Sequence, residues 1–287
     1  MKIKKKILIP LIIAASAILT VLATYIAHEN SNVGITEYTV SSSRLPESFD
    51  GYRIAQISDL HCAEFGENNA VLISMLNKIK PDVIFITGDL IDLRRGKMSV
   101  GTDFAKSATT IAPTYFVSGN HENDNEDFDS IADTLTNSGV TVLRGKSTRL
   151  YKDDEYITLV GIDDSFVIKE KEDETPSKDI IKAELEKLPV VGEEYTVLLA
   201  HRPNLINLYA EKGYDLVFSG HAHGGQFRFP IVGGIYAPEQ GLFPKYTDGV
   251  HTVGNTDIVI SRGLGNATFP FRIGNNPEIV AVTLKTE

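Results

Sequence analysis

An apolar stretch lies near the amino end of the chain, and short apolar runs alternating with segments of helical period follow it. Ile7 to Ile26 is twenty residues without a charge, rich in Ile, Leu, Val and Ala. At about 1.5 Å per residue, a helix of this length crosses a hydrocarbon core about 30 Å thick. A secretory signal has a shorter apolar region of about 7–15 residues. The pattern therefore favours an uncleaved single-pass anchor, preceded by Lys2, Lys4, Lys5 and Lys6.

The lysines beside the apolar stretch also predict its orientation. Because basic residues flank membrane spans mainly on the cytoplasmic side, we expect the amino end in the cytoplasm and the remainder of the chain outside it, at the cell membrane. Two alternatives stay open. Cleavage near Val21-Leu22-Ala23 would make the stretch a signal peptide and the protein a secreted one. A buried core helix is the other interpretation, and the flanking lysines disfavour it.

Apolar runs beyond residue 50 predict buried strands joined by amphipathic helices. The strands are predicted at Arg53–Ser58, Asp82–Thr87, Thr114–Ser118, Tyr195–Ala200 and Asp215–Ser219. The helices between them are predicted at Asn69–Lys80, Asp103–Ile111, Phe128–Asn137, Lys178–Lys187 and Asn204–Glu211. Alternation of this kind predicts a layered α/β domain with mixed sheets.

Shorter runs complete the predicted organisation. Gly34–Val40 is typical of an edge strand, and the charged stretch Lys169–Lys178 is typical of a solvated loop. Hairpin strands are predicted at Thr141–Leu143, Arg149–Tyr151, Tyr156–Ile162, Ile258–Ser261 and Glu278–Leu284. We therefore divide the chain into a cytoplasmic basic tip and anchor (1–27), a linker with an edge strand (28–50) and one catalytic or binding domain (51–287).

Composition and charge exclude several classes of protein. A hydrophobic fraction of 42% and a charged fraction of 23% exclude a disordered, collagen-like or multi-span membrane protein. A single Cys excludes a disulfide framework and a Cys-rich zinc module. The net charge is −10, but beyond residue 28 the chain has 24 Lys and Arg against 38 Asp and Glu, a balance of −14. This acidic body argues against a nucleic-acid partner.

A polar cluster follows each of the five strong strand candidates. The clusters are Asp59-Leu60-His61, Gly88-Asp89, Gly119-Asn120-His121-Glu122, His201 and Gly220-His221-Ala222-His223-Gly224-Gly225. Because sites in open α/β sheets form at the carboxyl ends of strands, we expect these clusters to converge. Five of the seven histidines lie in them, which chance scatter does not explain.

The residue types in these clusters point to metal ions. Asp, Asn and His supply oxygen and imidazole ligands, which suit Zn²⁺, Mn²⁺ or Fe. Taken singly, Asp59 or Asp89 is more typical of a turn or a helix cap. Together the clusters hold as many ligands as two metal ions with one shared carboxylate require: Asp59, His61, Asp89, Asn120, His201, His221 and His223.

The ordered set Asp-x-His, Gly-Asp, Gly-Asn-His-(Asp/Glu), His and Gly-His-x-His resembles the calcineurin-like metallophosphoesterases. The resemblance covers about residues 35–287. Residues 57–61, 220–226 and 261–265 resemble a membrane-anchored or secreted bacterial subgroup with phosphodiesterase-like members. The resemblance implies a four-layer α-β-β-α sandwich of two mixed sheets flanked by helices, preceded here by one N-terminal transmembrane helix.

The resemblance also implies a role for each matched residue. One divalent metal ion would be held by Asp59, His61, Asp89 and His223, and a second by Asp89, Asn120, His201 and His221, with Asp89 bridging. His121 matches a histidine that is not a ligand and that faces the substrate. Glu122 stands where many members have Asp, at a position that is not a ligand.

These assignments predict hydrolysis of a phosphodiester, pyrophosphate or phosphate ester. Two ions about 3.5–4 Å apart share a hydroxide that attacks phosphorus, and His121 would protonate the leaving oxygen. The ions are Mn, Zn or Fe by ligand type. A catalytically inactive metal-binding ectodomain at the cell surface is the alternative function.

The substrate is less defined than the reaction. A membrane position favours a small-molecule or lipid phosphate, lipid-linked or of the envelope, and no obligate protein partner is evident. Arg262 and Arg272 are candidate phosphate contacts, although a surface salt bridge or a turn explains each equally well. Asp92, Arg94 and Arg95 follow the second motif, and a solvated face explains them.

Overall fold

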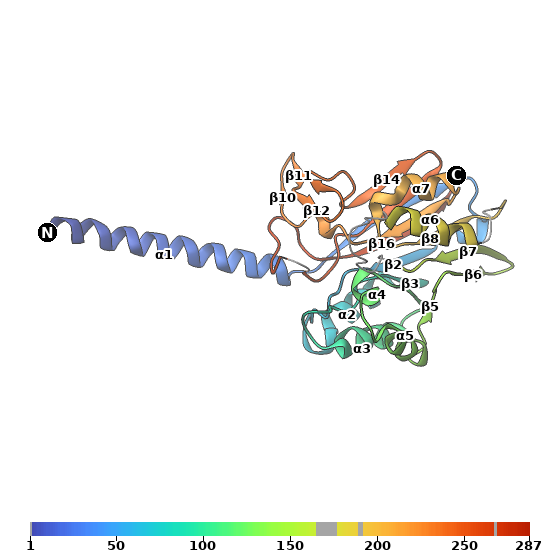
Figure 1. Cartoon of the computed structure of the whole chain (residues 1–287), viewed down its shortest axis with the longest axis horizontal. Helices are drawn as coiled ribbons and strands as arrows, with labels where there is room; N and C mark the ends of the chain where they lie inside the picture. Colours follow the sequence, from blue (N-terminus) through green and yellow to red (C-terminus); the bar gives the residue numbers. More distant parts are fainter. Residues whose placement is uncertain (1, 165–176, 189–191, 267–268) are drawn as a thin grey trace.

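Two six-stranded mixed sheets form the centre of the computed structural model, which describes residues 2–164, 177–188, 192–266 and 269–287 (Figure 1). The first sheet contains, in spatial order, β1 (Gly34–Ser42), β16 (Glu278–Thr286), β2 (Arg53–Ile57), β3 (Val83–Thr87), β4 (Thr114–Val117) and β5 (Thr141–Val142). β2 to β5 run parallel. β16 runs antiparallel to β2 and parallel to β1, which is the edge strand that the sequence predicts.

The second sheet has parallel strands at its centre and a hairpin at each edge. Its spatial order is β14 (Gly249–Val253), β15 (Thr256–Ile260), β9 (Leu216–Ser219), β8 (Thr196–Leu199), β7 (Glu155–Gly161) and β6 (Lys146–Lys152). Two small antiparallel pairs lie between β9 and β14 in sequence: β10 (Arg228–Phe229) with β11 (Gly233–Gly234), and β12 (Tyr236–Ala237) with β13 (Gly241–Leu242).

Helices cover the outer face of each sheet. The first sheet packs against α2 (Ala70–Ile79), α3 (Met98–Ala108) and α5 (Phe128–Asn137), and the second against α6 (Ser177–Lys187) and α7 (Ile206–Glu211). Short helical turns occur at η1 (Glu47–Phe49), η2 (Glu67–Asn69), α4 (Asn120–Asn123), η3 (Pro203–Leu205) and η4 (His223–Gly225). The expected four-layer α-β-β-α sandwich of two mixed sheets is therefore confirmed.

Strand β3 illustrates why the predicted strands are continuous apolar runs. Val83 and Phe85 point into the core between the sheets, whereas Ile84 and Ile86 point toward the helices. A strand covered on both faces has no polar side to alternate with. The ring of Phe85 meets that of Phe218 from the opposite sheet, with centroids 5.2 Å apart.

The five strong strand predictions agree with the structure to within one residue at each end, and Phe128–Asn137 has the bounds expected for α5. α3 begins at Met98 rather than Asp103, because Gly101 lowers the helical signal in sequence. A Cβ at this glycine would lie 2.8 Å from the Leu90 carbonyl oxygen, so its absence lets the helix pack closely. Residues 165–176, most of the predicted charged loop, lie outside the described residues.

Two predicted hairpin strands are wrong in their pairing. β5, expected in a hairpin, instead extends the parallel part of the first sheet beside β4. β16 lies between β1 and β2, in the sheet opposite to β15. Strands that follow each other in the sequence need not pair, because the chain can cross from one sheet to the other between them. The predicted hairpin of β6 with β7 is confirmed, and β14, which pairs with β15, was not predicted.

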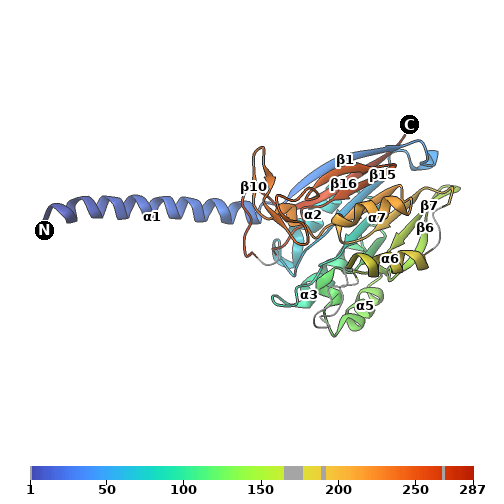
Figure 2. The ribbon, with the colours of Figure 1, turned by 45° about the horizontal axis from the view of Figure 1, so that its top comes forward.

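Helix α1 (Lys2–Ser31) projects from one end of the sandwich, opposite to the β6–β7 hairpin (Figures 1 and 2). Residues Ile9–Ser31 are long and apolar enough to cross a membrane, with a mean hydropathy of 2.2, and none of this helix window is buried. Such exposure contradicts the interpretation of the stretch as a buried core helix.

Candidate metal centre

The carboxyl ends of five strands bring the predicted ligands together. β2, β3 and β4 are adjacent in the first sheet, and β8 and β9 are adjacent in the second. Because the sheets pack face to face, the turns that follow these strands meet at one end of the molecule. Six of the seven predicted ligands are buried there, and Asn120 is half-buried.

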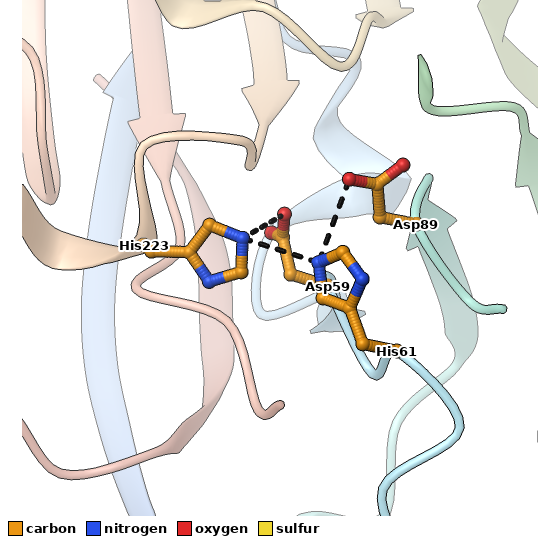
Figure 3. Close-up of side chains that lie close together, drawn as sticks. All are labelled: Asp59, His61, Asp89 and His223. Atoms are coloured by element: carbon orange, nitrogen blue, oxygen red, sulfur yellow. Dashed lines mark hydrogen bonds and ion pairs between the residues drawn. The ribbon is translucent and has the colours of Figure 1, made fainter. Parts of the chain in front are cut away.

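Asp59, His61, Asp89 and His223 form the first cluster (Figure 3). One potential ligand atom of each lies within 4.8 Å of the others. Nε2 of His223 is 3.3 Å from Oδ1 of Asp59 and 3.1 Å from Nε2 of His61. Two imidazole nitrogens that face each other at this distance need a proton or a cation between their lone pairs.

The second cluster shares a carboxylate with the first. Asp89, His201 and His221 have potential ligand atoms within 4.8 Å of one another. Oδ2 of Asp89 lies 3.3 Å from Nε2 of His201 and 3.5 Å from Nε2 of His61, so this one oxygen faces both clusters. Nδ1 of His221 lies 3.1 Å from Nε2 of His201.

Unusual backbone geometry aims these side chains. Asp59, His61, Asp89, His221 and His223 all have a positive φ between 47° and 63°, a conformation that residues other than glycine rarely adopt. Each such residue costs about 1–3 kcal/mol, which the packing and hydrogen bonds around it must offset. Strain of this kind concentrates at functional sites, because the fold then directs a side chain where regular structure would not.

Two glycines let the ligand turns approach each other. A Cβ at Gly119 would overlap Oδ1 of Asp89, and a Cβ at Gly220 would overlap the side chains of Ser58 and Asp59. Neither glycine has a positive φ. Glycine is therefore needed at both positions because a side chain would collide with a carboxylate. Such close approach is expected where ligand-bearing loops are packed together.

Burial and charge keep two of the histidines in the form that binds metal. Burial lowers the pKa of His61 well below its usual value. Burial, together with the positive charge of Arg272, lowers the pKa of His223 in the same direction. Both imidazoles are therefore neutral at neutral pH, and a neutral imidazole is a metal ligand.

Asp89 and His201 have the opposite electrostatics. Burial disfavours the charged form of each, but their mutual attraction outweighs it, so the pKa of Asp89 is held low and that of His201 is raised to about 10. A divalent cation that binds here would displace the His201 proton, because metal binding and protonation compete for the same nitrogen.

Glu122 braces the turns that carry the ligands. Its carboxylate accepts backbone N–H hydrogen bonds from Asp89 (2.8 Å), Ile91 (2.9 Å) and Gly119 (2.8 Å). Burial and the charge of Asp89 raise the pKa of Glu122. The longer side chain at this position thus reaches the backbone of both the second and the third motif.

His121 lies beside the clusters with one ring nitrogen already engaged. Its Nδ1 accepts a hydrogen bond from the backbone N–H of Leu93 at 3.2 Å. In a neutral ring the other nitrogen, Nε2, then carries the proton. Asp92 lies between this ring and His61, with carboxylate oxygens 3.7 Å from Nδ1 of each histidine.

Sequence reasoning misjudged Asp92 and missed Glu239. The Asp92 carboxylate is 1% exposed, so the expected solvated face is wrong for this residue, whereas Arg94 and Arg95 are exposed. Oε2 of Glu239 lies 2.5 Å from Nε2 of His221, and Oε1 lies 2.9 Å from an Nη of Arg202. Although burial opposes ionisation, these two partners lower the pKa of Glu239 to about 2. Glu239 lies in the turn between β12 and β13, two-residue strands that are too short to give a periodic signal in sequence.

A cavity of about 230 Å³ opens onto this centre. It is lined by Asp89, Arg94, Asn120, His121, Asp124, Arg202, His221, His223, Pro238 and Glu239. The cavity thus joins predicted ligands from both clusters, His121 and an exposed arginine. Its size suits a phosphoryl group with part of its substituents.

Arg262 and Arg272 contact the protein itself. An Nη of Arg262 pairs with Oε2 of Glu278 at 2.5 Å. Arg272 is fully buried, with Nη2 3.2 Å from Nδ1 of His223 and Nη1 2.6 Å from the Arg262 carbonyl oxygen. Neither arginine is among the residues that line the cavity.

The ligand types and their surroundings fit divalent cations. Oδ1 of Asn120 is buried and has no hydrogen-bond partner among the described residues. An unpaired acceptor beside carboxylates and neutral imidazoles is well placed to become a ligand. The double-sheet sandwich and this buried Asp and His centre at its strand ends define a metal-dependent hydrolase.

Comparison with known proteins specifies the family. The model of the calcineurin-like phosphoesterases matches residues 52–225, a range that contains all seven predicted ligands and His121. The chain is 30% identical over 264 residues to the uncharacterized metallophosphoesterase YkuE of Bacillus subtilis, covering 88% of this chain and 85% of that protein. The chain belongs to the calcineurin-like phosphoesterase family and is a phosphoester hydrolase.

Two further relatives differ in how much of their own length the match covers. Phosphodiesterase YaeI of Escherichia coli is 29% identical, with 81% of this chain and 82% of that protein covered. A zebrafish protein (Danio rerio) named as a transmembrane protein with a metallophosphoesterase domain is 26% identical over 95% of this chain. The match spans only 62% of the zebrafish protein.

Proposed function

We propose that this hydrolase cleaves a phosphodiester, pyrophosphate or phosphate ester of a lipid-linked or envelope substrate, using two divalent metal ions. The observation that carries the proposal is the position of Asp89. One of its carboxylate oxygens faces His61 on one side and His201 on the other, as a ligand shared by two ions would. Bound ions would activate water as the nucleophile and neutralise charge on the phosphoryl oxygens.

The proposed ligand sets follow the two clusters. Asp59, His61, Asp89 and His223 would hold the first ion, and Asp89, Asn120, His201 and His221 the second. Asn120 enters the second set because its buried oxygen lacks a partner among the described residues and borders the same cavity. Mn, Zn or Fe fit these oxygen and imidazole ligands.

We assign His121 as the proton donor. In the protonated ring, Nδ1–H would face Asp92, and Nε2–H would be available where the ring lines the cavity. As water adds to phosphorus, the ester P–O bond breaks, the leaving oxygen takes the Nε2 proton and the ring becomes neutral. Asp92 would stabilise the positive charge on the ring before this transfer.

Arg94 is a better-placed phosphate contact than the arginines predicted from sequence. Its side chain is 54% exposed and borders the cavity. Direct phosphate contacts by Arg262 and Arg272 stay predictions, and their contacts with Glu278 and His223 support a role in positioning the last loop.

The proposed substrate class follows from the anchor. Helix α1 has the length and composition of a membrane span. We propose that residues 1–27 hold the catalytic domain (51–287) at the outer surface of the cell membrane through residues 28–50, a linker that also adds β1 to the first sheet. The four lysines support this orientation. An enzyme held there has access to lipid-linked and envelope phosphates rather than to cytoplasmic nucleotides.

Metal-reconstituted full-length protein tests the function. With Mn²⁺, we expect hydrolysis of bis-p-nitrophenyl phosphate that a chelator abolishes and that added Mn²⁺ restores. A screen of phospholipids and UDP-linked lipids would then identify the substrate. Metal binding at full occupancy without turnover of any of these esters would refute the proposal and favour an inactive metal-binding ectodomain.

A further inference from the structure

Exposed apolar side chains gather on the segment that carries β10 to β13. Phe229 is 51% exposed, Ile231 is fully exposed, and Leu242 and Phe243 are 69% and 67% exposed. Val232, at 53%, continues the same surface. We call these five residues the apolar tips. None is charged. Arg228 and Glu239 beside them pair with Asp248 and His221, whereas Lys245, two residues beyond Phe243, is exposed.

The backbone of the tips is strained as well as exposed. Ile231 has a φ of 73° and Phe243 a φ of 54°, although both are bulky residues for which this conformation is disfavoured. Because the side chain of Ile231 is fully exposed, no packing contact with the described residues of the domain offsets the strain of this turn. Contact with an apolar environment outside the domain would supply the missing stabilisation.

Strand register places the ligand-bearing turns near the anchor. β1 starts at Gly34, three residues beyond the end of α1, and Gly34 pairs with Glu278 at the start of β16. β16 is antiparallel to β2, with Val280 opposite Gln56, so the carboxyl end of β2 lies at the same end of the sheet. The ligand-bearing turns therefore lie at the end from which α1 leaves.

Direct contacts fix the end of α1 to this region. Asn30 exchanges hydrogen bonds with the backbone of Arg272, its Oδ1 accepting from N at 2.8 Å and its Nδ2 donating to O at 3.0 Å. Tyr25 of α1 lines one cavity of about 680 Å³ together with Phe229, Ile231 and Ile273. Figures 1 and 2 both show β10 beside the end of the helix.

We propose that the apolar tips insert into the bilayer that α1 spans, and that the metal centre thereby opens toward the membrane surface. Tyr25 indicates the depth of the membrane boundary, because aromatic residues are enriched where hydrocarbon meets water. Phe229 and Ile231 of the tips line the same cavity as Tyr25. Pro238 and Glu239 connect the two features, since they line the metal-site cavity from the segment between the tips. A phosphate headgroup would then reach the metal centre without its chain leaving the bilayer.

A lipid bilayer is the occupant that the structure favours over a protein. The tips lie beside the end of a helix whose own exposed surface is apolar, and five uncharged apolar side chains suit hydrocarbon. The proposal rests on the anchoring part of the proposed function and requires no catalysis.

The chain contains no Trp, so one introduced Trp reports a single position. We would place Ile231→Trp, and Phe243→Trp as a second probe, in full-length protein reconstituted into vesicles of phosphatidylethanolamine and phosphatidylglycerol. Ile18→Trp in α1 reports on the anchor. Tyr151→Trp is the matched control, because Tyr151 is 66% exposed on β6, at the end opposite to α1.

Lipids brominated on their acyl chains should quench the tryptophan fluorescence of Ile231→Trp as strongly as that of Ile18→Trp, and acrylamide in the water should quench neither. Tyr151→Trp should respond only to acrylamide. Quenching of both tip probes by acrylamide alone would overturn the inference, and if Ile18→Trp still responds to brominated lipid the anchor survives. Loss of the lipid response at Ile18→Trp as well would overturn both. Shielding of the tips from both quenchers would assign them to a second copy of the chain and overturn the bilayer proposal.

Discussion

Glu239 should tune the metal site through His221, although it touches no predicted ion. In Glu239→Gln, a neutral amide replaces the carboxylate that lies 2.5 Å from Nε2 of His221 and 2.9 Å from an Nη of Arg202. The ring loses a charge-assisted hydrogen bond that fixes its orientation and increases the basicity of Nδ1, the nitrogen facing His201. The substitution preserves shape, so the change is mainly electrostatic.

The size of the effect follows from the exposure of the carboxylate. Losing such an outer partner typically costs about 10–100-fold in metal affinity. The Glu239 side chain is 34% exposed, so solvent screens part of the interaction and we expect the lower end of this range. A tenfold weaker affinity corresponds to about 1.4 kcal/mol of binding free energy.

Calorimetric titration of chelator-treated protein with Mn²⁺ measures this change. Binding at the site that contains His221 should weaken about tenfold, while the site with Asp59 and His61 keeps its affinity. Glu211→Gln, which removes an exposed carboxylate from α7, is the matched control and should bind as the wild type does. Unchanged Mn²⁺ affinity at both sites in a folded Glu239→Gln protein would refute the reasoning.

Three further substitutions test the site. His121→Ala should keep both metal ions and lower kcat about 10²–10⁴-fold; a metal-replete variant with full turnover would contradict its role as proton donor. Asp89→Asn should lose both ions, because one oxygen faces both clusters, and elemental analysis that still finds two metals per chain would exclude the bridge. Gly119→Ala should reduce metal content without unfolding the chain, because the new Cβ would overlap the Asp89 carboxylate. Wild-type metal content in this variant, with an unchanged melting temperature, would show that the loops relax freely.

The strand-end chemistry could be predicted because it is local. A strand that is covered on both faces is mostly apolar, so a change to a polar cluster marks where it ends, and Asp59, Asp89 and His201 each lie at such a change. Parallel strands place their carboxyl ends at one edge. Their sequence order was therefore enough to predict that these residues converge.

The surroundings of the site could not be predicted in the same way. Asp92 follows the second motif among charged residues that reach the surface, yet its carboxylate is buried between two histidines. Glu239 lies in the turn between β12 and β13, and its two partners come from the turns after β8 and β9. No periodicity encodes such contacts, because they depend on how one loop folds over another.

The sequence by itself determined the number of strands that end in ligands, the residue types at those ends and the apolar helix at the amino end. These features depend on the pattern of apolar and polar residues within short segments, so residues that are neighbours in the sequence are enough to specify them. The tertiary structure alone decided that β16 lies between β1 and β2, because strand pairing joins residues far apart in the chain. That pairing brings the start of β1, and with it the end of α1, to the edge where the ligands meet.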